Sequence, residues 1–337
     1  MVDFYHGRGV RQKPDSAHRL VPTTLPMHAM LLCAGLGTRL RPLTDERPKP
    51  LVPLVGRPLA SFALDALARH RVRHVVANAH HLAAQIDPGL RPWCERHGQS
   101  LTTLTETAIL GTGGGIRNAL PHLGGGDFVV FNGDVLAAPD LTAAVAHHRA
   151  TGALMTMVLR DDPRAEKAGV IELTAAGRVV RMLNEGLAAD EPTARCLFTG
   201  IYVLSSAIAD ELPAEGCVVK HTLRRLLAKG ARVSGVIERS PWYDLGAPAS
   251  YAEANFALAS GALAWPGWSA PADGVVRGDG VRVASDVTLA GPLVLGDGAT
   301  VTGAGALREC IVWDGATVEA PAARVIVSRG HRVAIPG

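Results

Sequence analysis

The sequence predicts an α/β fold with a mostly parallel sheet, followed by a β-helix. Short apolar runs alternate with segments of helical periodicity through most of the 337 residues, a pattern typical of a sheet covered by helices on both faces. After about residue 265 the helical periodicity stops, and Val281, Val287 and Leu293 recur at six-residue spacing. A period of six with one aliphatic residue is typical of the turns of a β-helix. A few irregular β-hairpins are the alternative.

The first elements of the α/β part surround a glycine-rich loop. Residues 28–33 (HAMLLC) form a short apolar run that meets glycines at once, which predicts a buried strand entering a loop. Residues 73–79 (RHVVANA) predict a second strand, and residues 81–86 the start of a helix. Residues 58–70 predict a helix because their apolar side chains have helical spacing, namely Leu59, Phe62, Ala63 and Leu67.

The later elements continue the alternation. Ligands of such sheets lie at the carboxyl ends of the strands. The loop at Gly35 and the turn from Asn132 to Asp134 both fall at such ends. The remaining expected elements are strands at 101–106, 127–131, 153–160 and 178–182 and a helix at 143–151.

Domain boundaries follow from local composition. Residues 1–26 are polar, lack periodicity and contain no apolar core of a secretory signal. The segment 264–272 (AWPGWSAPA) contains two prolines, which predicts a linker. We therefore expect a disordered tail at 1–27, an α/β domain at 28–263 and a β-helix at 270–337.

Composition argues against several classes of protein. The formal net charge is +3, too small to favour a nucleic-acid partner. No apolar run approaches the ~18 residues of a transmembrane helix, so no membrane partner is expected. The five cysteines are odd in number and lack CxxC spacing, which argues against a disulfide framework and a zinc site. We therefore expect a protein of the reducing cytoplasm.

A loop and a lysine suited to phosphate stand close together after the first strand. The glycines of the loop let the backbone approach a ligand and offer N–H groups to phosphate oxygens. Lys49 stands between two prolines that restrict the backbone around it. With Arg39 it could stabilise charge in a phosphoryl-transfer transition state. The loop matches neither a Walker loop nor the GxGxxG fingerprint, and a solvated basic turn is the alternative.

The stretch AGLGTRLRPLT, followed by PKPLVPL, resembles the signature of the sugar-1-phosphate nucleotidyltransferases, also called NDP-sugar pyrophosphorylases. The resemblance covers roughly residues 28–260 and extends more loosely to the C-terminus. It implies a Rossmann-like mixed-sheet nucleotidyltransferase domain followed by a short left-handed β-helix. Through that β-helix the chain could form a homo-oligomer.

For the nucleotide, the resemblance implies a phosphate loop and a base site. The segment from Glu106 to Gly115 is similar to the family's E-x-x-x-x-G-T-[AG]-G, where a run of glycines lets a flat base stack on backbone. Glu106 could accept two hydrogens from a guanine edge, and a solvated carboxylate is the alternative. The implied catalytic residues are Arg39 and Lys49, and the implied nucleotide-binding residues are Ala34, Gly35, Leu36, Gly37, Thr38, Glu106, Gly111, Thr112 and Gly113.

Two further motifs of the family imply a metal site. Asn132-Gly133-Asp134 resembles its N-G-D turn, and residues 242–246 (WYDLG) resemble its W-x-D-x-G motif. Asp134 and Asp244 would hold Mg²⁺, which takes one or two protein carboxylates together with phosphate oxygens. Taken alone, either aspartate would more often be a turn or helix cap.

The sugar-phosphate side carries the one clear departure from the family. Residues 167–171 (KAGVI) and 198–202 (FTGIY) resemble segments that lie beside the sugar. Family members usually have E-K-P after the strand at 178–182, with the lysine on the substrate phosphate. Here Glu185 stands at the lysine position, where it would repel phosphate, unless Arg181, Lys167 or Lys220 substitutes. The implied sugar-phosphate-binding residues are Gly169, Asn184, Thr199 and Gly200.

The implied reaction transfers a nucleotidyl group from an NTP to a sugar 1-phosphate, with Mg²⁺ as cofactor. Glu106 and the two-part layout favour GTP and mannose 1-phosphate. N-acetylmuramate-1-phosphate uridylyltransferase and heptose-1-phosphate guanylyltransferase activities are the alternatives. Glu185 also permits a non-catalytic regulatory subunit that binds sugar nucleotides. An acyltransferase in the C-terminal part is disfavoured, because the only histidine there is His331, at its very end.

Overall fold

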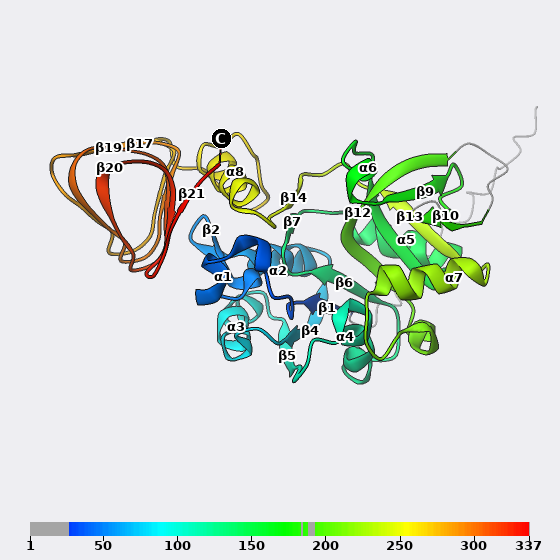
Figure 1. The fold of residues 1–337 in the computed structure, drawn as a ribbon. Helices are drawn as coiled ribbons and strands as arrows, with labels where there is room; N and C mark the ends of the chain where they lie inside the picture. The colour runs from blue at the N-terminus through cyan, green and yellow to red at the C-terminus, as the bar shows by residue number, and fades with distance from the viewer. Residues whose placement is uncertain (1–26, 183–184, 188–192, 337) are drawn as a thin grey trace, which may run out of the picture.

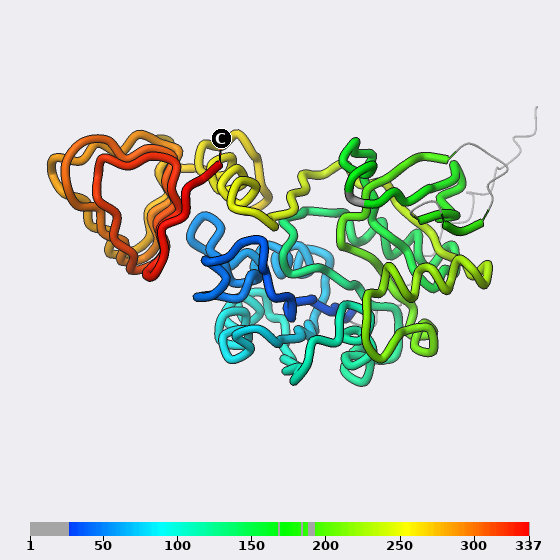
Figure 2. Tube along the Cα trace, in the orientation of Figure 1, coloured from blue at the N-terminus to red at the C-terminus, as the bar shows by residue number. Residues whose placement is uncertain are grey.

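The computed structural model describes residues 27–182, 185–187 and 193–336. The tail expected at 1–27 therefore lies outside the described residues, except for Met27, which opens the first strand. Asn184 lies outside them as well. The molecule is elongated, with stacked C-terminal coils at one end beside the first half of the α/β domain (Figures 1 and 2).

The elements of the α/β domain follow the predicted alternation. The helices are α1 (Leu43–Glu46), α2 (Leu59–Arg69), α3 (Ile86–Arg96), α4 (Gly111–Ala119), α5 (Leu141–Thr151), α6 (Ala165–Ala168), α7 (Arg224–Ala228) and α8 (Pro248–Ala259). The strands are β1 (Met27–Leu32), β2 (Pro53–Leu54), β3 (Arg57–Pro58), β4 (Val72–Ala79), β5 (Ser100–Thr105), β6 (Phe128–Asn132), β7 (Val135–Ala137), β8 (Met155–Arg160), β9 (Val170–Thr174), β10 (Val179–Met182), β11 (Glu185–Gly186), β12 (Thr193–Leu204), β13 (Val233–Ile237) and β14 (Trp242–Asp244). The short 3₁₀ and π segments are η1 (Thr38–Leu40), η2 (Lys49–Leu51), η3 (Ala83–Gln85), η4 (Leu120–His122), η5 (Ser206–Glu211) and η6 (Val218–Leu223).

The predicted strands and helices are confirmed, with each end displaced by at most two residues. The exception is the helix expected to start within 81–86. That stretch is mostly a turn and the short segment η3, and the α-helix itself begins at Ile86.

The central sheet is mixed, which confirms what the family resemblance implies and corrects the mostly parallel sheet expected from the alternation of strands and helices. Its strand order is β11-β10-β9-β12-β6-β1-β4-β5, with β8 and β13 attached beyond β12. β5, β4, β1 and β6 are parallel, whereas β12 is antiparallel to β6, β8 and β9. β9 and β10 are joined by a short turn, and strands joined in that way must be antiparallel.

Helices cover both faces of the parallel half of the sheet (Figure 1). Successive side chains of a strand point to opposite faces. Along β1, Ala29 and Leu31 belong to the hydrophobic cluster of α2, α3 and α5. Met30, between them, belongs to the cluster that contains side chains of α4 and α7. The carboxyl edge of these strands is thus held rigidly from both sides.

The C-terminal part is a seven-stranded, mostly parallel sheet that winds into stacked coils (Figure 2). Val275 pairs with Leu293 and Val287 with Gly305, so each partner lies three six-residue periods further along the chain. Val281, Val287 and Leu293 all pack in one cluster, as the six-residue spacing predicts. The strands are β15 (Val275–Arg277), β16 (Arg282–Val283), β17 (Val287–Ala290), β18 (Leu293–Leu295), β19 (Thr300–Val312), β20 (Thr317–Val327) and β21 (Arg332–Ala334).

The two parts of the molecule share a hydrophobic cluster, and the expected linker belongs to it. The cluster joins Leu43 and Tyr251 of the α/β domain to Trp313 of the coils. Trp265, inside the segment expected to be a linker, is only 5% exposed. Its ring meets that of Phe62 edge to face, with the centroids 5.8 Å apart. The two prolines of this segment therefore shape a packed connection.

Substituting Trp265 tests whether this segment is packed. Trp265→Ala removes a buried indole, and we expect the free energy of unfolding to fall by about 3–5 kcal/mol. Val283→Ala, at a side chain that is 37% exposed, serves as control and should stay within about 0.5 kcal/mol of the wild type. Urea unfolding measures both, and equal small changes in the two variants would show that the segment is a free linker.

Candidate active site

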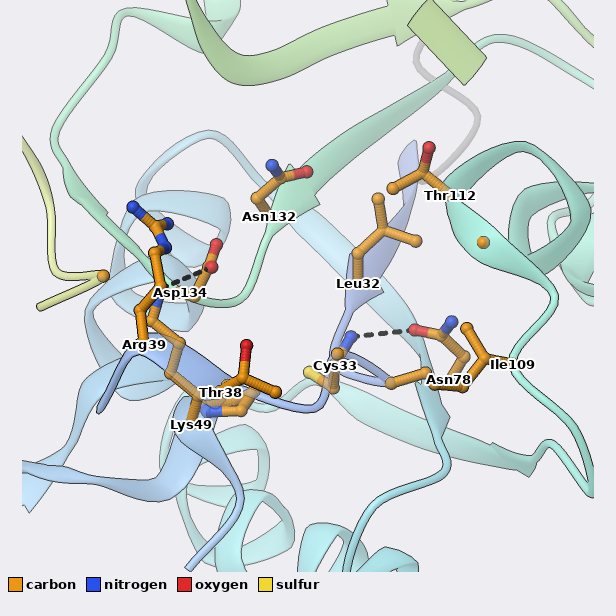
Figure 3. Close-up of a pocket in the computed structure, with 16 residues that line it drawn as sticks. Leu32, Cys33, Thr38, Arg39, Lys49, Asn78, Ile109, Thr112, Asn132 and Asp134 are labelled. Atoms are coloured by element: carbon orange, nitrogen blue, oxygen red, sulfur yellow. Dashed lines mark hydrogen bonds and ion pairs between the residues drawn. The ribbon is translucent and has the colours of Figure 1, made fainter. Parts of the chain in front are cut away.

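Residues from distant parts of the chain meet in a cavity of about 280 Å³ at the carboxyl ends of β1, β4 and β6 (Figure 3). This is the edge where the sequence predicts a ligand. The lining residues are Leu32, Cys33, Ala34, Gly35, Gly37, Thr38, Arg39, Lys49, Pro50, Asn78, Ile109, Gly111, Thr112, Asn132, Asp134 and Gly246.

The loop after β1 forms one wall of the cavity. Its first backbone N–H, at Cys33, donates to Oδ1 of Asn78 at 2.8 Å, which fixes the loop to β4. Gly37 has a φ of +62°, and a Cβ there would lie 2.9 Å from Cγ2 of Thr44. A Cβ at Gly35 would meet no protein atom within 4 Å. Gly37 is thus required by the fold, whereas Gly35 faces open space where a ligand can approach.

Most of the predicted phosphate-loop residues line the cavity, but Leu36 does not. Ala34, Gly35, Gly37 and Thr38 all contribute to the wall. The side chain of Leu36 is 39% exposed and lies outside it. Leu36 is therefore a surface position of the loop.

Four charged side chains form a chain of ion pairs at one side of the cavity. Nζ of Lys49 lies 2.6 Å from Oδ2 of Asp134 and 3.7 Å from Oδ1 of Asp244. Nη2 of Arg39 lies 3.4 Å from Oδ2 of the same Asp244. Lys49 is 7% exposed at its side chain, whereas the other three are 36–67% exposed. The two cations and two carboxylates that motif order predicted to act together are therefore in contact.

Strand pairing brings the two aspartates together across 110 residues of sequence. Asp134 immediately precedes β7, and Asp244 ends β14, which pairs antiparallel with β7. Asp244 is in register with Val135, the neighbour of Asp134. Two residues after Asp244, a Cβ at Gly246 would collide with the guanidinium of Arg39. Gly246 therefore leaves the space in which Arg39 reaches the cluster.

Cys33 lines the cavity but is not a nucleophile. Its thiol is buried, and burial together with the nearby carboxylate of Asp134 holds its pKa far above the usual value. A thiol that stays protonated is a poor nucleophile. The chemistry of this cavity therefore rests on the charged cluster.

Glu106 is a buried bridge within the protein, which corrects its interpretation as a solvated carboxylate, whereas base recognition by Glu106 stays a prediction. It is 4% exposed and does not line the cavity. Oε1 accepts a hydrogen bond from Nδ2 of Asn78 at 2.7 Å, and Oε2 accepts one from the backbone N–H of Leu110 at 3.1 Å. Glu106 therefore holds Asn78, and through it the loop at Cys33, against the start of α4.

The glycine run has a packing role in addition to the base platform that the resemblance implies, which stays a prediction. A Cβ at Gly113 would lie 2.8 Å from the ring of Pro213, and one at Gly115 would lie 2.8 Å from Nδ2 of Asn78. Both glycines are buried in α4, so Gly113 does not line the cavity. Only Gly111 and Thr112, at the start of this helix, do so.

Of the residues predicted for the sugar phosphate, the three that the structure describes, Gly169, Thr199 and Gly200, do not line this cavity. The hydroxyl of Thr199 is buried and donates to the carbonyl of Val158 at 2.7 Å. Gly200 has a φ of +83° and lies behind Asn132, whose Nδ2 would be 2.7 Å from a Cβ there. Gly169, with a φ of +117°, ends α6. Among the described residues, Gly200 thus packs against Asn132, Thr199 bonds β8, and Gly169 caps α6.

Glu185, at the position of the family's lysine, is paired with a cation. Its Oε2 lies 2.6 Å from Nε of Arg224, with both side chains more than half exposed. The ion pair offsets the negative charge that would repel a phosphate. Lys167 and Lys220 are exposed, and neither lines the cavity.

Sequence reasoning missed several lining residues, among them Asn78, Asn132 and Ile109. Asn78 and Asn132 share a signal, because each is a polar residue near the carboxyl end of an apolar run, in HVVANA and DFVVFN. The histidines after β4 have structural roles. His80 bonds the carbonyl of Glu106, and His81 bonds the carbonyl of Thr44.

Within the described residues, no group of three or more His, Cys, Asp or Glu side chains could hold a metal.

The sequence is similar to that of known nucleotidyltransferases. Residues 28–261 match the family model "Nucleotidyl transferase". The chain is 31% identical over 302 residues to a mannose-1-phosphate guanylyltransferase of Mycobacterium tuberculosis, covering 88% of this chain and 82% of that protein. It is 32% identical over 243 residues to an N-acetylmuramate alpha-1-phosphate uridylyltransferase of Caulobacter vibrioides, covering 69% of this chain and 98% of that one.

Solved structures share the fold. The crystal structure of HddC from Yersinia pseudotuberculosis, complexed with GMP-PN, superposes with a TM-score of 0.55 at 21% identity. The match covers 68% of this chain and 98% of that one. No helix among residues 27–182, 185–187 and 193–336 is long and apolar enough to cross a membrane.

Glu106→Gln separates a bridging role from a base-reading role. The amide would set a donor against a donor at Asn78 or Leu110, so we expect the free energy of unfolding to fall by about 1–3 kcal/mol. The preference among nucleoside triphosphates should stay within twofold of the wild type (~0.4 kcal/mol). Urea unfolding and competition kinetics measure the two effects, with Glu309→Gln, at an exposed carboxylate, as control. A switch in base preference with unchanged stability would refute the bridging role.

Proposed function

This chain belongs to the nucleotidyl transferase family and is a sugar-1-phosphate nucleotidyltransferase, and we propose that its substrates are GTP and mannose 1-phosphate. The products would be GDP-mannose and pyrophosphate. The observation that carries the proposed mechanism is the contact of Lys49 with both Asp134 and Asp244 beside the glycine loop.

The proposed reaction is an in-line displacement at the α-phosphorus of the nucleotide. An oxygen of the sugar phosphate forms a bond to this phosphorus while the bond to the pyrophosphate oxygen breaks. The attacking oxygen is already anionic at neutral pH, so no general base is needed. Catalysis then consists of positioning and charge stabilisation, which suits a cavity whose thiol stays protonated.

Each side chain of the cluster has a role in this proposal. The N–H groups of the loop and the guanidinium of Arg39 would hold the β- and γ-phosphates. Nζ of Lys49, nearly excluded from water, would stabilise negative charge at the reacting phosphate. An ammonium group acts more strongly in such a site than in bulk water, because the local dielectric constant is lower.

The donor set fits Mg²⁺. Asp134 and Asp244 are hard oxygen ligands that lie side by side and remain partly exposed, and Mg²⁺ takes one or two carboxylates together with substrate phosphates. The cluster of Arg39, Lys49 and two aspartates is formally neutral, so a bound triphosphate would bring negative charge that the cluster alone does not offset. Mg²⁺ supplies that charge when bound, and the two aspartates would hold it.

The choice of GTP and mannose 1-phosphate rests on likeness to the guanylyltransferase, which extends over 88% of this chain. The N-acetylmuramate-1-phosphate uridylyltransferase relative matches 69% of this chain. A uridylyltransferase acting on N-acetylmuramate 1-phosphate, or a heptose-1-phosphate guanylyltransferase, is the second candidate. The presence of Arg39, Lys49, Asp134 and Asp244 in one cluster favours an active enzyme over a regulatory subunit.

The proposal also covers the fold and self-association of the C-terminal coils and the cellular compartment of the enzyme. The six-residue period and the parallel pairing of successive coils support a left-handed β-helix. Self-association through these coils stays a prediction that sedimentation velocity can check. Five free cysteines suit a reducing cytoplasm.

Lys49→Ala tests the central role of the lysine. We expect kcat to fall about 10²–10³-fold, since one preorganised charge at the reacting phosphate is lost. Lys229→Ala is a matched control, because Nζ of Lys229 also lies 2.6 Å from a carboxylate, that of Glu211, but on the surface. Steady-state pyrophosphate release measures both variants, and circular dichroism checks their folding. A folded Lys49→Ala variant with full turnover would eliminate this assignment.

Metal removal tests the proposed role of the aspartates. We expect turnover to be lost in excess EDTA and restored by Mg²⁺, and Asp134→Asn to raise the Mg²⁺ concentration for half-maximal rate at least tenfold (about 1.4 kcal/mol). Asp279→Asn, in the coils, is the control. Undiminished turnover in excess EDTA would contradict the metal site.

A further inference from the structure

The segment that carries Lys49 is held at both ends by the C-terminal coils. It runs from Glu46, at the end of α1, through η2 to Pro53, at the start of β2. Prolines flank Lys49, and the lysine is buried within this stretch. A shift of either end of so short a segment would move Nζ relative to Asp134.

The first end is fixed by Glu46 and Arg47. Oε1 of Glu46 accepts hydrogen bonds from the hydroxyl of Ser328 and, at 3.0 Å, from the backbone N–H of Gly330. Nη2 of Arg47 lies 2.8 Å from Oδ2 of Asp314. The same guanidinium lies over the ring of Trp313, 5.6 Å from its centroid. Arg47 and Asp314 are each about 30% exposed, so this charge-assisted contact is partly shielded from water.

The second end is reached through Tyr251. Its hydroxyl donates to the carbonyl of Pro53 and accepts from Nε1 of Trp313 at 3.1 Å. Tyr251 is buried, as is Trp313. Both ends of the lysine segment therefore lead to the same turn of the coils, at residues 313 and 314.

The same helix α1 also touches the phosphate loop. The hydroxyl of Thr44 donates to the carbonyl of Gly37 at 3.0 Å, and Cγ2 of Thr44 is the atom that excludes any side chain at Gly37. Gln85 donates to the carbonyl of Glu46 at 3.2 Å. A displacement of α1 would therefore reach the loop as well as Lys49.

We propose that the C-terminal coils position Lys49 and the phosphate loop for the nucleotidyl transfer proposed above. Arg47 is the positioning residue, and Trp313 and Asp314 are its support. The coils are then a working part of the active site, and catalysis depends on their docking. None of these coil residues lines the cavity, so they act through the segment 46–53.

Arg47→Gln tests the proposal, with Arg324→Gln as matched control. Arg324 also pairs with a carboxylate, at 3.0 Å from Glu309, but within the coils and away from the α/β domain. We expect Arg47→Gln to lower kcat about 10–100-fold, because a misplaced catalytic group is costly, with KM for the sugar phosphate within twofold (~0.4 kcal/mol). Arg47→Lys should restore most of kcat. Asp314→Asn should lower kcat as much as Arg47→Gln does, and the double variant Arg47→Gln/Asp314→Asn should show no further loss of kcat.

A second measurement does not depend on turnover. Acetylation of lysines by an N-hydroxysuccinimide ester, followed by mass spectrometry, reports how accessible each amine is. We expect Lys49 to react several-fold faster in Arg47→Gln (about 1 kcal/mol of local opening), while the exposed Lys167 and Lys220 react as in the wild type. Unchanged kcat and unchanged Lys49 labelling in a folded Arg47→Gln variant would overturn the proposal. A wild type without turnover for any substrate pair would instead reject the proposed function, and the labelling would still decide the positioning role.

Discussion

The contact of one nearly buried ammonium group with two carboxylates organises this molecule. Lys49 comes from η2, Asp134 from the turn after β6 and Asp244 from the end of β14. Three separate elements must therefore be placed within ångströms of one another. The pairing of β7 with β14 places the aspartates, the helices on both faces of the sheet hold the carboxyl edge, and the prolines around Lys49 limit its backbone. A buried cation without these partners would be strongly destabilising.

The same arrangement explains why the site suits phosphoryl chemistry. Charges that are fixed before substrate binds need little reorganisation during the reaction. Glu106, Asn78 and the backbone of Cys33 form a buried relay of hydrogen bonds behind the loop, and Thr44 supports the loop from the opposite side. The glycines 113 and 115 allow α4 to approach this relay closely. The loop is thus rigid at its base, while Gly35 and Arg39 remain open to a ligand.

Local sequence patterns predicted much of the fold and of the charged cluster. Except for the helix after β4, apolar runs predicted the bounds of the expected strands and helices to within two residues. Motif order identified Arg39, Lys49, Asp134 and Asp244, which the fold brings into contact. The motif did not reveal that Glu106 and Gly113 are buried, because burial depends on the tertiary structure. The segment at Trp265 resembled a linker because prolines mark both linkers and packed turns. The family resemblance implied the mixed sheet, whereas the alternation of strands and helices did not, because strand direction depends on connections whose path only the tertiary structure shows.

At the sugar-phosphate end, Glu185 stands in place of the family's lysine and pairs with Arg224. Whether this pair tolerates a sugar phosphate decides between an enzyme and a regulatory subunit. The most direct measurement is pyrophosphate release from a panel of GTP, UTP, ATP and CTP, each combined with mannose, glucose and N-acetylmuramate 1-phosphates. The account predicts stoichiometric release, fastest with GTP and mannose 1-phosphate. Nucleotide binding without release from any pair would contradict it.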